Sequence, residues 1–121
     1  MAWKFNDHEA VFIQIVNRLR SDILSGKYPP DSKFPPVRQL AYEAAVNPNT
    51  MQKALSLLED EGILCPHGTI GRFVTSDTAV LEAAREEVKR KCVRSLLEDA
   101  TRLGISAEEL IKYIKEEADK R

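Results

Sequence analysis

Apolar residues recur at helical spacing along most of the chain, apart from one short stretch where the spacing becomes that of strands. From about Asp7 to Ser25 they fall every three or four positions, which predicts an amphipathic helix ended by Gly26. The following Tyr28-Pro29-Pro30-Asp31 cannot continue a helix and predicts a loop. A second, short helix is expected from Pro35-Pro36 to about Ala45. The apolar positions of the first helix are Val11, Phe12, Ile15, Val16, Leu19, Ile23 and Leu24.

A third helix is expected to start at Asn47-Pro48-Asn49-Thr50. Asn is a favoured N-cap, because its side-chain oxygen accepts a bond from a first-turn NH, and Pro suits the next position. Polar and cationic groups then crowd the positive end of the helix dipole, as they do in a recognition helix that faces phosphates and base edges. A capped surface helix without that role has the same pattern. The polar groups are Asn49, Thr50, Gln52 and Lys53, and the apolar face is Met51, Ala54, Leu55 and Leu58.

After Gly62 the pattern becomes extended, with short strands expected at 63–65 and 72–75 around a glycine-containing tip at 66–71. Val46 is expected to fill a tight turn between helices two and three, which gives the spacing of a helix-turn-helix. A helix-turn-helix followed by a β-hairpin is a winged helix, whose hairpin reaches DNA beside the recognition helix. We therefore expect residues 1–76 to form a winged helix-turn-helix DNA-binding domain.

The remaining residues, 77–121, are expected to form two helices. A long one runs from Asp77 or Thr78 to Leu103, and a capping box at Ser106 and Glu109 starts another at about Ala107. So wide an apolar surface in so few residues needs a partner. The simplest is a second copy, which makes residues 77–121 a two-helix dimerisation region; folding back on the winged helix of the same chain is the alternative. The fold class is thus mainly α with a small β-hairpin. The apolar positions are Leu81, Ala84, Val88, Cys92, Val93, Leu96, Leu97, Ala100 and Leu103, then Leu110, Ile111, Ile114 and Ala118.

Composition and charge limit these expectations. The 121 residues are 43% apolar and 31% charged, which suits a folded protein, but the net charge of −1 gives no overall basic character. Any binding of nucleic acid must rest on local charge. Between residues 32 and 58 three cations face the single acid Glu43, whereas residues 59–61 put three acids at the far end of the third helix. The cations are Lys33, Arg38 and Lys53.

Several classes of protein are disfavoured. There is no apolar run of the roughly 18 residues that span a membrane, and the first residues lack the layout of a signal peptide, so we expect a cytoplasmic protein without a membrane partner. Cys65 and Cys92 lie far apart with no Cys/His cluster, so neither a disulfide framework nor a metal site is expected, and both should be reduced and packed. No catalytic or cofactor-binding motif is present. We expect no enzyme activity and no cofactor.

Over residues 8–76 the chain resembles the GntR family of bacterial transcription regulators. The short two-helix C-terminal part is similar to the YtrA-type subgroup. The resemblance implies dimerisation through the C-terminal helices and repression, often of operons that include ABC transporter genes. The matching segments are 13–15, 19–20, 23–26, Lys33-Phe34-Pro35-Pro36-Val37-Arg38-Gln39-Leu40-Ala41, Val46-Asn47-Pro48-Asn49-Thr50, 54–55, 58–59, 61–64 and Gly71-Arg72-Phe73-Val74.

Carried over by position, the resemblance implies DNA contacts in three places. Arg38 in helix two offers a bidentate fork to guanine or phosphate; Asn49 and Gln52 can bond adenine, and Thr50 suits a phosphate or a thymine methyl. Lys53 either contacts a phosphate or is an ordinary solvated surface residue. His67 of the wing has the same two alternatives, contact with DNA or simple solvation. The remaining implied contacts are Asn47 at the helix start and His67, Gly68 and Thr69 at the wing.

The chain departs from the family pattern at three points. Pro36 stands where the family has a capping Ser, Gln52 stands where much of the family has Arg, and the wing at 66–71 is less basic than usual. A neutral Gln52 should change base preference and lower the salt dependence of binding. A winged helix that binds protein rather than DNA is the rival interpretation.

The sequence does not identify an effector. A two-helix region has little room for a cavity of about 300 Å³, so a ligand would have to bind at a dimer interface or between modules. Trp3 and Phe5 are expected to pack against the first helix rather than line such a crevice.

Overall fold

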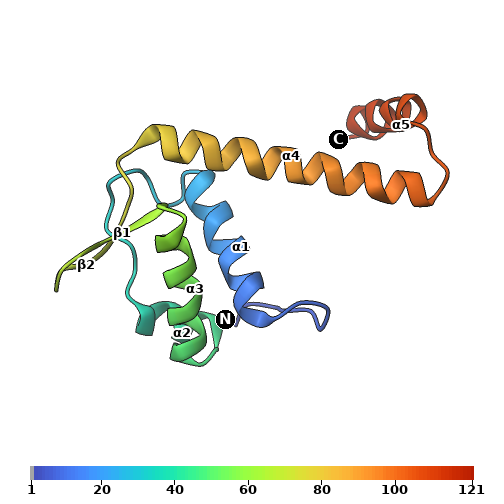
Figure 1. Ribbon diagram of the computed structural model, residues 1–121. Helices are drawn as coiled ribbons and strands as arrows, with labels where there is room; N and C mark the ends of the chain where they lie inside the picture. The colour runs from blue at the N-terminus through green and yellow to red at the C-terminus, as the bar shows by residue number, and fades with distance from the viewer. Residues whose placement is uncertain (1) are drawn as a thin grey trace. The chain divides into compact units, whose positions relative to one another are not determined.

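The computed structural model describes residues 2–121 (Figure 1). It is mainly helical with one β-hairpin, which confirms the expected fold class. The chain divides into two compact units, one that runs to Ala84 and another formed by Arg85–Arg121, and the division falls within the long fourth helix. The elements in order are α1 (Val11–Leu24), α2 (Val37–Ala44), α3 (Pro48–Asp60), β1 (Leu64–His67), β2 (Gly71–Val74), α4 (Thr78–Arg102) and α5 (Ala107–Asp119).

The core of the first unit lies between α1, α2 and α3, and the first turns of α4 add Leu81 to it. Helices α1 and α3 lie side by side and run in the same direction (Figure 1). Phe12 contacts Lys53 near one end, and Arg20 contacts Glu61 near the other. The spacing from Phe12 to Arg20 along the chain equals the spacing from Lys53 to Glu61, as parallel helices require. The parallel arrangement places the N-terminal turns of both helices at the same end. Trp3 and Phe5 pack against this core, and the Trp3 ring lies under Arg18 of α1, which confirms the expected packing on the first helix for Trp3.

Two helices start later than the apolar pattern predicted. Helix α1 begins at Val11 rather than near Asp7. The side-chain amide of Gln14 donates to the Asn6 carbonyl and accepts from the Asn6 NH, and these two bonds hold the residues before the helix in a turn. Helix α2 begins at Val37, and Pro36 is its N-cap with extended backbone and no side-chain cap. This is the poorly satisfied start that the loss of the family's Ser implies.

The hairpin is longer toward its tip than expected. Strand β1 includes Pro66 and His67, and the antiparallel register pairs Leu64 with Val74 and His67 with Gly71. Only residues 68–70 form the turn. The sequence misplaced these bounds because proline is depleted in strands, yet an edge strand tolerates it.

A third segment, missed from the sequence, lies along the other side of β2. Lys33 bridges to Phe73, Phe34 N donates to Arg72 O at 2.8 Å, and Val74 N donates to Ser32 O at 2.9 Å. The loop after α1 therefore forms an isolated antiparallel bridge beside the two-stranded sheet, and β2 is held on both sides. This fixes the base of the hairpin and leaves its tip projecting (Figure 1).

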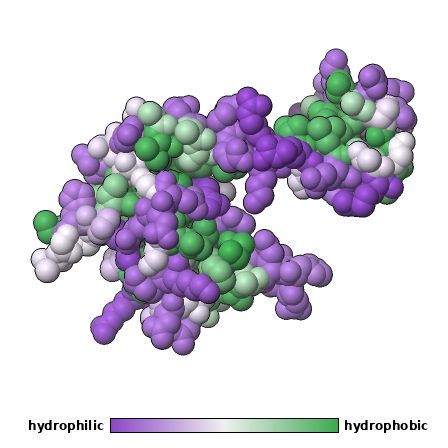
Figure 2. Space-filling view, in the orientation of Figure 1, coloured by the Kyte–Doolittle hydropathy of each residue, from purple (hydrophilic) through white to green (hydrophobic). Residues whose placement is uncertain are grey.

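The second unit has almost no core of its own. Within Arg85–Arg121 the one buried residue is Ala100, and Arg85, Ile105 and Leu110 are half-buried, while all other side chains there are exposed. The expected capping box at Ser106 and Glu109 is present and starts α5. Figure 2 shows the resulting apolar surface in green over α5. The exposed apolar side chains are Val88, Val93, Leu96, Leu97, Leu103, Ile111, Tyr113 and Ile114.

Other expectations concern cysteines and membranes. Both cysteines are free, but only Cys65 is partly buried; Cys92 is exposed, so the expectation that both are packed is wrong. Among residues 2–121 no side chain buries Cys92 or the exposed apolar side chains beside it on α4. Among residues 2–121, no helix combines the length and apolar character needed to cross a bilayer.

Candidate nucleic-acid interface

The start of α3 is built as the sequence predicted. Asn47 is the N-cap, its side-chain Oδ1 accepts from Asn49 N at 2.7 Å, and Pro48 is the first helical residue. Met51, Ala54, Leu55 and Leu58 are buried, so they hold the opposite face of the helix against the core. The side chains of Asn47, Asn49 and Gln52 are exposed and that of Thr50 is half-buried. One edge of the helix is therefore polar, rigidly supported and open to a ligand.

Arg38 on α2 is exposed and has no ion-pair partner among residues 2–121. A free guanidinium on a short helix beside α3 is suited to bind phosphate or a guanine edge. Sequence reasoning did not single out Tyr42, whose side chain is 79% exposed. It follows Arg38 by four positions, so helical spacing alone puts the two on one face.

The turn between α2 and α3 depends on an unusual backbone conformation. Ala45 is left-handed, with φ 58° and ψ 48°, and its NH donates to Tyr42 O. Val46 lies in this turn, as the sequence predicted, and packs against the core. This sharp reversal brings α2 and α3 together as a helix-turn-helix.

Lys53 has a neighbour that sequence spacing did not reveal. Its Nζ lies 3.8 Å from the centroid of the Phe12 ring, although its side chain remains exposed. A ring that covers one side of an ammonium group leaves other N–H donors free. Lys53 is therefore an exposed cation with an aromatic ring on one side, and its contact with a phosphate stays a prediction.

The wing presents a different surface from that expected. His67 lies on β1 with its ring centroid 4.7 Å from that of Phe73, so it is not at the tip. The tip consists of Gly68, Thr69 and Ile70, and the Ile70 side chain is 63% exposed. Gly68 has φ 54°, a conformation that favours glycine. The wing thus offers backbone, a hydroxyl and an apolar side chain rather than cations.

The acidic end of α3 is less negative than its sequence indicated. Arg20 of α1 binds Glu61 through two bonds of 2.9 and 2.5 Å, and Arg72 of the wing binds Glu59. Both acids are therefore neutralised by arginines from other elements, which sequence analysis missed because the partners are distant along the chain.

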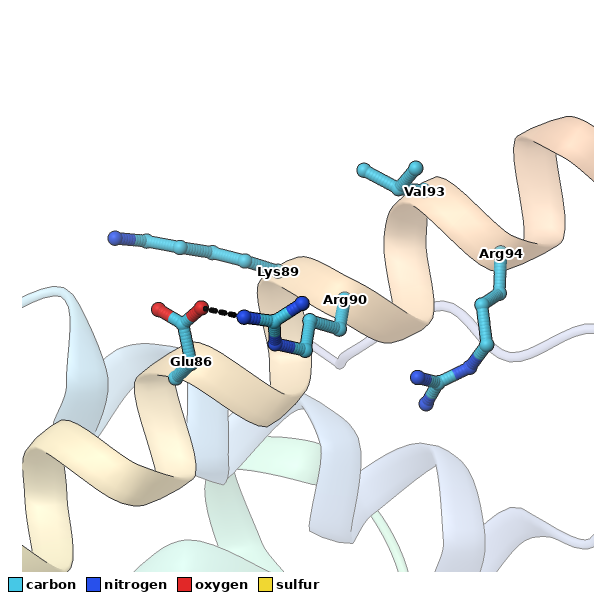
Figure 3. A pocket seen from close by; sticks show the side chains of 5 residues that line it. All are labelled: Glu86, Lys89, Arg90, Val93 and Arg94. Atoms are coloured by element: carbon cyan, nitrogen blue, oxygen red, sulfur yellow. Dashed lines mark ion pairs between the residues drawn. The ribbon is translucent and has the colours of Figure 1, made fainter.

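The surface hollows of the second unit do not resemble an enclosed ligand site. One of about 330 Å³ is lined by five residues of α4 alone, and another of about 510 Å³ is lined by residues of α5 and by Arg121. Figure 3 shows the first, where Arg90 pairs with Glu86 along the helix. Among residues 2–121 no three potential metal ligands come together. The lining of the first hollow is Glu86, Lys89, Arg90, Val93 and Arg94.

A helix-turn-helix with an exposed polar recognition edge and an adjoining hairpin defines a winged-helix DNA-binding protein. Residues 13–74 match the model of the bacterial regulatory proteins of the gntR family. The chain belongs to the GntR family and is a DNA-binding transcriptional regulator.

Individual relatives agree with this assignment. The transcriptional repressor YtrA of Bacillus subtilis is 32% identical over 108 residues, which cover 88% of this chain and 82% of YtrA. A GntR family regulator from Listeria monocytogenes has a TM-score of 0.87 at 28% identity, over 93% of this chain and 98% of that one. The YtrA-type resemblance is thereby confirmed, and regulators rather than enzymes are the relatives.

Some of the similar structures are complexes with an operator. The DNA-binding domain of AraR in complex with operator ORX1 has a TM-score of 0.54 at 26% identity, over 62% of this chain and 92% of that one. The winged-helix part of this chain therefore resembles a domain whose structure is known in complex with its operator.

Proposed function

We propose that the protein is a cytoplasmic repressor that binds a two-fold operator as a homodimer. Residues 1–76 serve as the DNA-binding domain and residues 77–121 as the dimerisation region. The observation that carries the proposal is the two-sided character of α3. Its apolar face is buried, and its first turns present exposed polar side chains. A helix held in this way can enter a major groove without disturbing the core.

In the proposed complex the contacts fall into two groups. Asn49 and Gln52 read base edges, and Arg38 adds a bidentate contact to a base or phosphate. Lys53 and the amide of Asn47 bind phosphates, and the wing approaches the backbone or minor groove. With few free cations, hydrogen bonds contribute more than bulk charge. The remaining contacts are Thr50, His67, Gly68 and Thr69.

The exposed apolar faces of α4 and α5 support the dimer. Ile111 and Ile114 are 53% and 47% exposed, and apolar residues are exposed over most of both helices. A patch of this kind marks an interaction surface, and a second copy buries both faces by two-fold symmetry. Two copies then present two recognition helices to a palindromic site. The similarity to the repressor YtrA supports repression, and the YtrA-type resemblance supports an operon with transporter genes as the target.

The test is a binding titration with fluorescein-labelled duplexes that carry inverted repeats from the region upstream of the protein's own gene. Arg38→Ala should weaken specific binding by about 1 to 3 kcal/mol, the value of a bidentate contact. Lys27→Ala is the control, because Lys27 follows the C-terminal end of α1 and so lies away from the N-terminal turn of α3. Absence of specific binding, or equal losses in both variants, contradicts the proposal and leaves a protein-interaction module.

A further inference from the structure

Arg72 links the wing to the far end of the recognition helix. Its Nε donates to Oε1 of Glu59 in the last turn of α3, and the two side chains are only 19% and 25% exposed. Salt screens a partly buried pair less than a surface pair. The peptide connection from α3 to the hairpin runs through Gly62 into β1, and the ion pair is a second, lateral link that joins α3 to β2.

The backbone of Arg72 has contacts of its own. It lies opposite Pro66 in β1, and its carbonyl accepts from Phe34 N at 2.8 Å. Only Gly71 separates it from the tip at 68–70. A change in the position of Arg72 therefore reaches the tip through a single residue.

We propose that Arg72 and Glu59 are positioning residues that set the direction in which the wing leaves the recognition helix, and thereby the wing's contribution to DNA binding. The inference rests on the proposed DNA-binding function. The pair itself lies away from the reading edge, because Glu59 follows Asn49 by ten residues, about 15 Å along the helix axis. The guanidinium is engaged by a carboxylate and is not available as a free cation.

The proposal predicts an effect of opposite sign to that of simple electrostatics. Glu59→Gln removes a negative charge from a protein that binds a polyanion, so charge alone would strengthen binding. If the pair holds the wing, the same substitution weakens binding, because the neutral amide makes a weaker bond to Arg72. The direction of the change separates the two accounts.

Glu61, two positions after Glu59, offers a matched control. Glu61 also receives an arginine in a bidentate pair, but its partner Arg20 belongs to α1 and has no link to the wing. Glu61→Gln therefore removes the same charge and a similar ion pair from the same helix end. It should leave the wing in place.

The experiment measures the affinity of full-length variants for the labelled upstream duplexes at several salt concentrations, below each variant's melting temperature. Glu59→Gln and Arg72→Gln should each bind about three- to tenfold more weakly, the range expected for one charge-assisted contact. The slope of log affinity against log salt should not change, since the tip of the wing carries no cation and no cationic contact to a phosphate is lost. The exchanged pair Glu59→Arg with Arg72→Glu should recover most of the loss, and Glu61→Gln should bind as tightly as wild type or more tightly.

A footprint adds a readout that general instability does not reproduce. Hydroxyl-radical protection at the outer minor grooves should weaken in Glu59→Gln while protection at the recognition helices remains. Wild-type affinity in Glu59→Gln, or a flatter salt slope in Arg72→Gln, overturns the inference and leaves the proposed function intact. Failure of wild type to bind any duplex specifically overturns both. If Arg72→Gln does not fold, Glu59→Gln and the exchanged pair still decide the question.

Discussion

The ammonium of Lys53 lies 3.8 Å from the centroid of the Phe12 ring, so the first turn of α1 supports a cation in the second turn of the recognition helix. The ring favours the ammonium group electrostatically and limits the conformations of a long, exposed side chain. A lysine held in this way loses less freedom when it binds a phosphate.

This contact predicts different effects for the two partners. Lys53→Met should weaken DNA binding and lower the magnitude of the salt slope by about 0.9, the value for one phosphate. Phe12→Leu keeps the charge and should leave the slope unchanged, while affinity falls by about two- to fivefold through loss of the cation–π contact. Titrations over a series of salt concentrations measure both. An unchanged slope in Lys53→Met would show that Lys53 does not bind a phosphate.

Substitutions of Asn47 should separate helix capping from DNA binding. Asn47→Ala removes the acceptor for Asn49 N and should lower the free energy of unfolding by about 1 kcal/mol. Asn47→Asp keeps an acceptor but loses the amide donor and adds a negative charge, so stability should be retained while DNA binding weakens. Urea unfolding and DNA titration measure the two effects. Equal stability of the Ala and Asp variants would contradict the capping role.

Ala45 should gain stability from a substitution that is usually destabilising. Its φ of 58° lies in the left-handed region, which costs an L-residue about 1 to 2 kcal/mol and costs glycine almost nothing. After allowance for the extra freedom of glycine in the unfolded chain, Ala45→Gly should stabilise the protein by about 0.5 kcal/mol. Ala44→Gly is the control, because Ala44 is helical and buried and its loss should destabilise. If thermal unfolding shows that both variants are less stable than wild type, Ala45 is not strained.

The apolar face of α5 should be required for dimerisation but not for folding of the winged helix. Ile114→Glu places a charge in the proposed interface and should give a monomer at micromolar concentration with weaker binding to a two-half-site duplex. Lys115→Glu changes an exposed neighbour on the same helix and is the control. Sedimentation or light scattering gives the mass, and circular dichroism monitors the fold. A dimer that persists in Ile114→Glu would place the interface elsewhere.

The candidate site was predictable from the sequence where its contacts are local. The α3 start and the α5 capping box each depend on bonds between residues two or three positions apart, and such bonds leave a pattern of residue types in the chain. Where local polar bonds competed with the apolar pattern, the prediction failed: the Asn6–Gln14 contact delays α1, and strand pairing draws His67 away from the tip. Hydrophobic periodicity carries no information about these competing contacts.

The sequence by itself determined the order of helices, hairpin and helical pair, because hydrophobic spacing, caps and turn residues act within a few positions of one another. The tertiary structure alone decided which charges are available. Phe12 reaches Lys53, Arg20 reaches Glu61 and Arg72 reaches Glu59 only once α1, α3 and the wing have packed together. These partners lie on separate elements, and the packed core brings them within contact distance, so no spacing along the chain encodes them. The structure thereby pairs two of the three acids at the end of α3 with arginines from α1 and the wing.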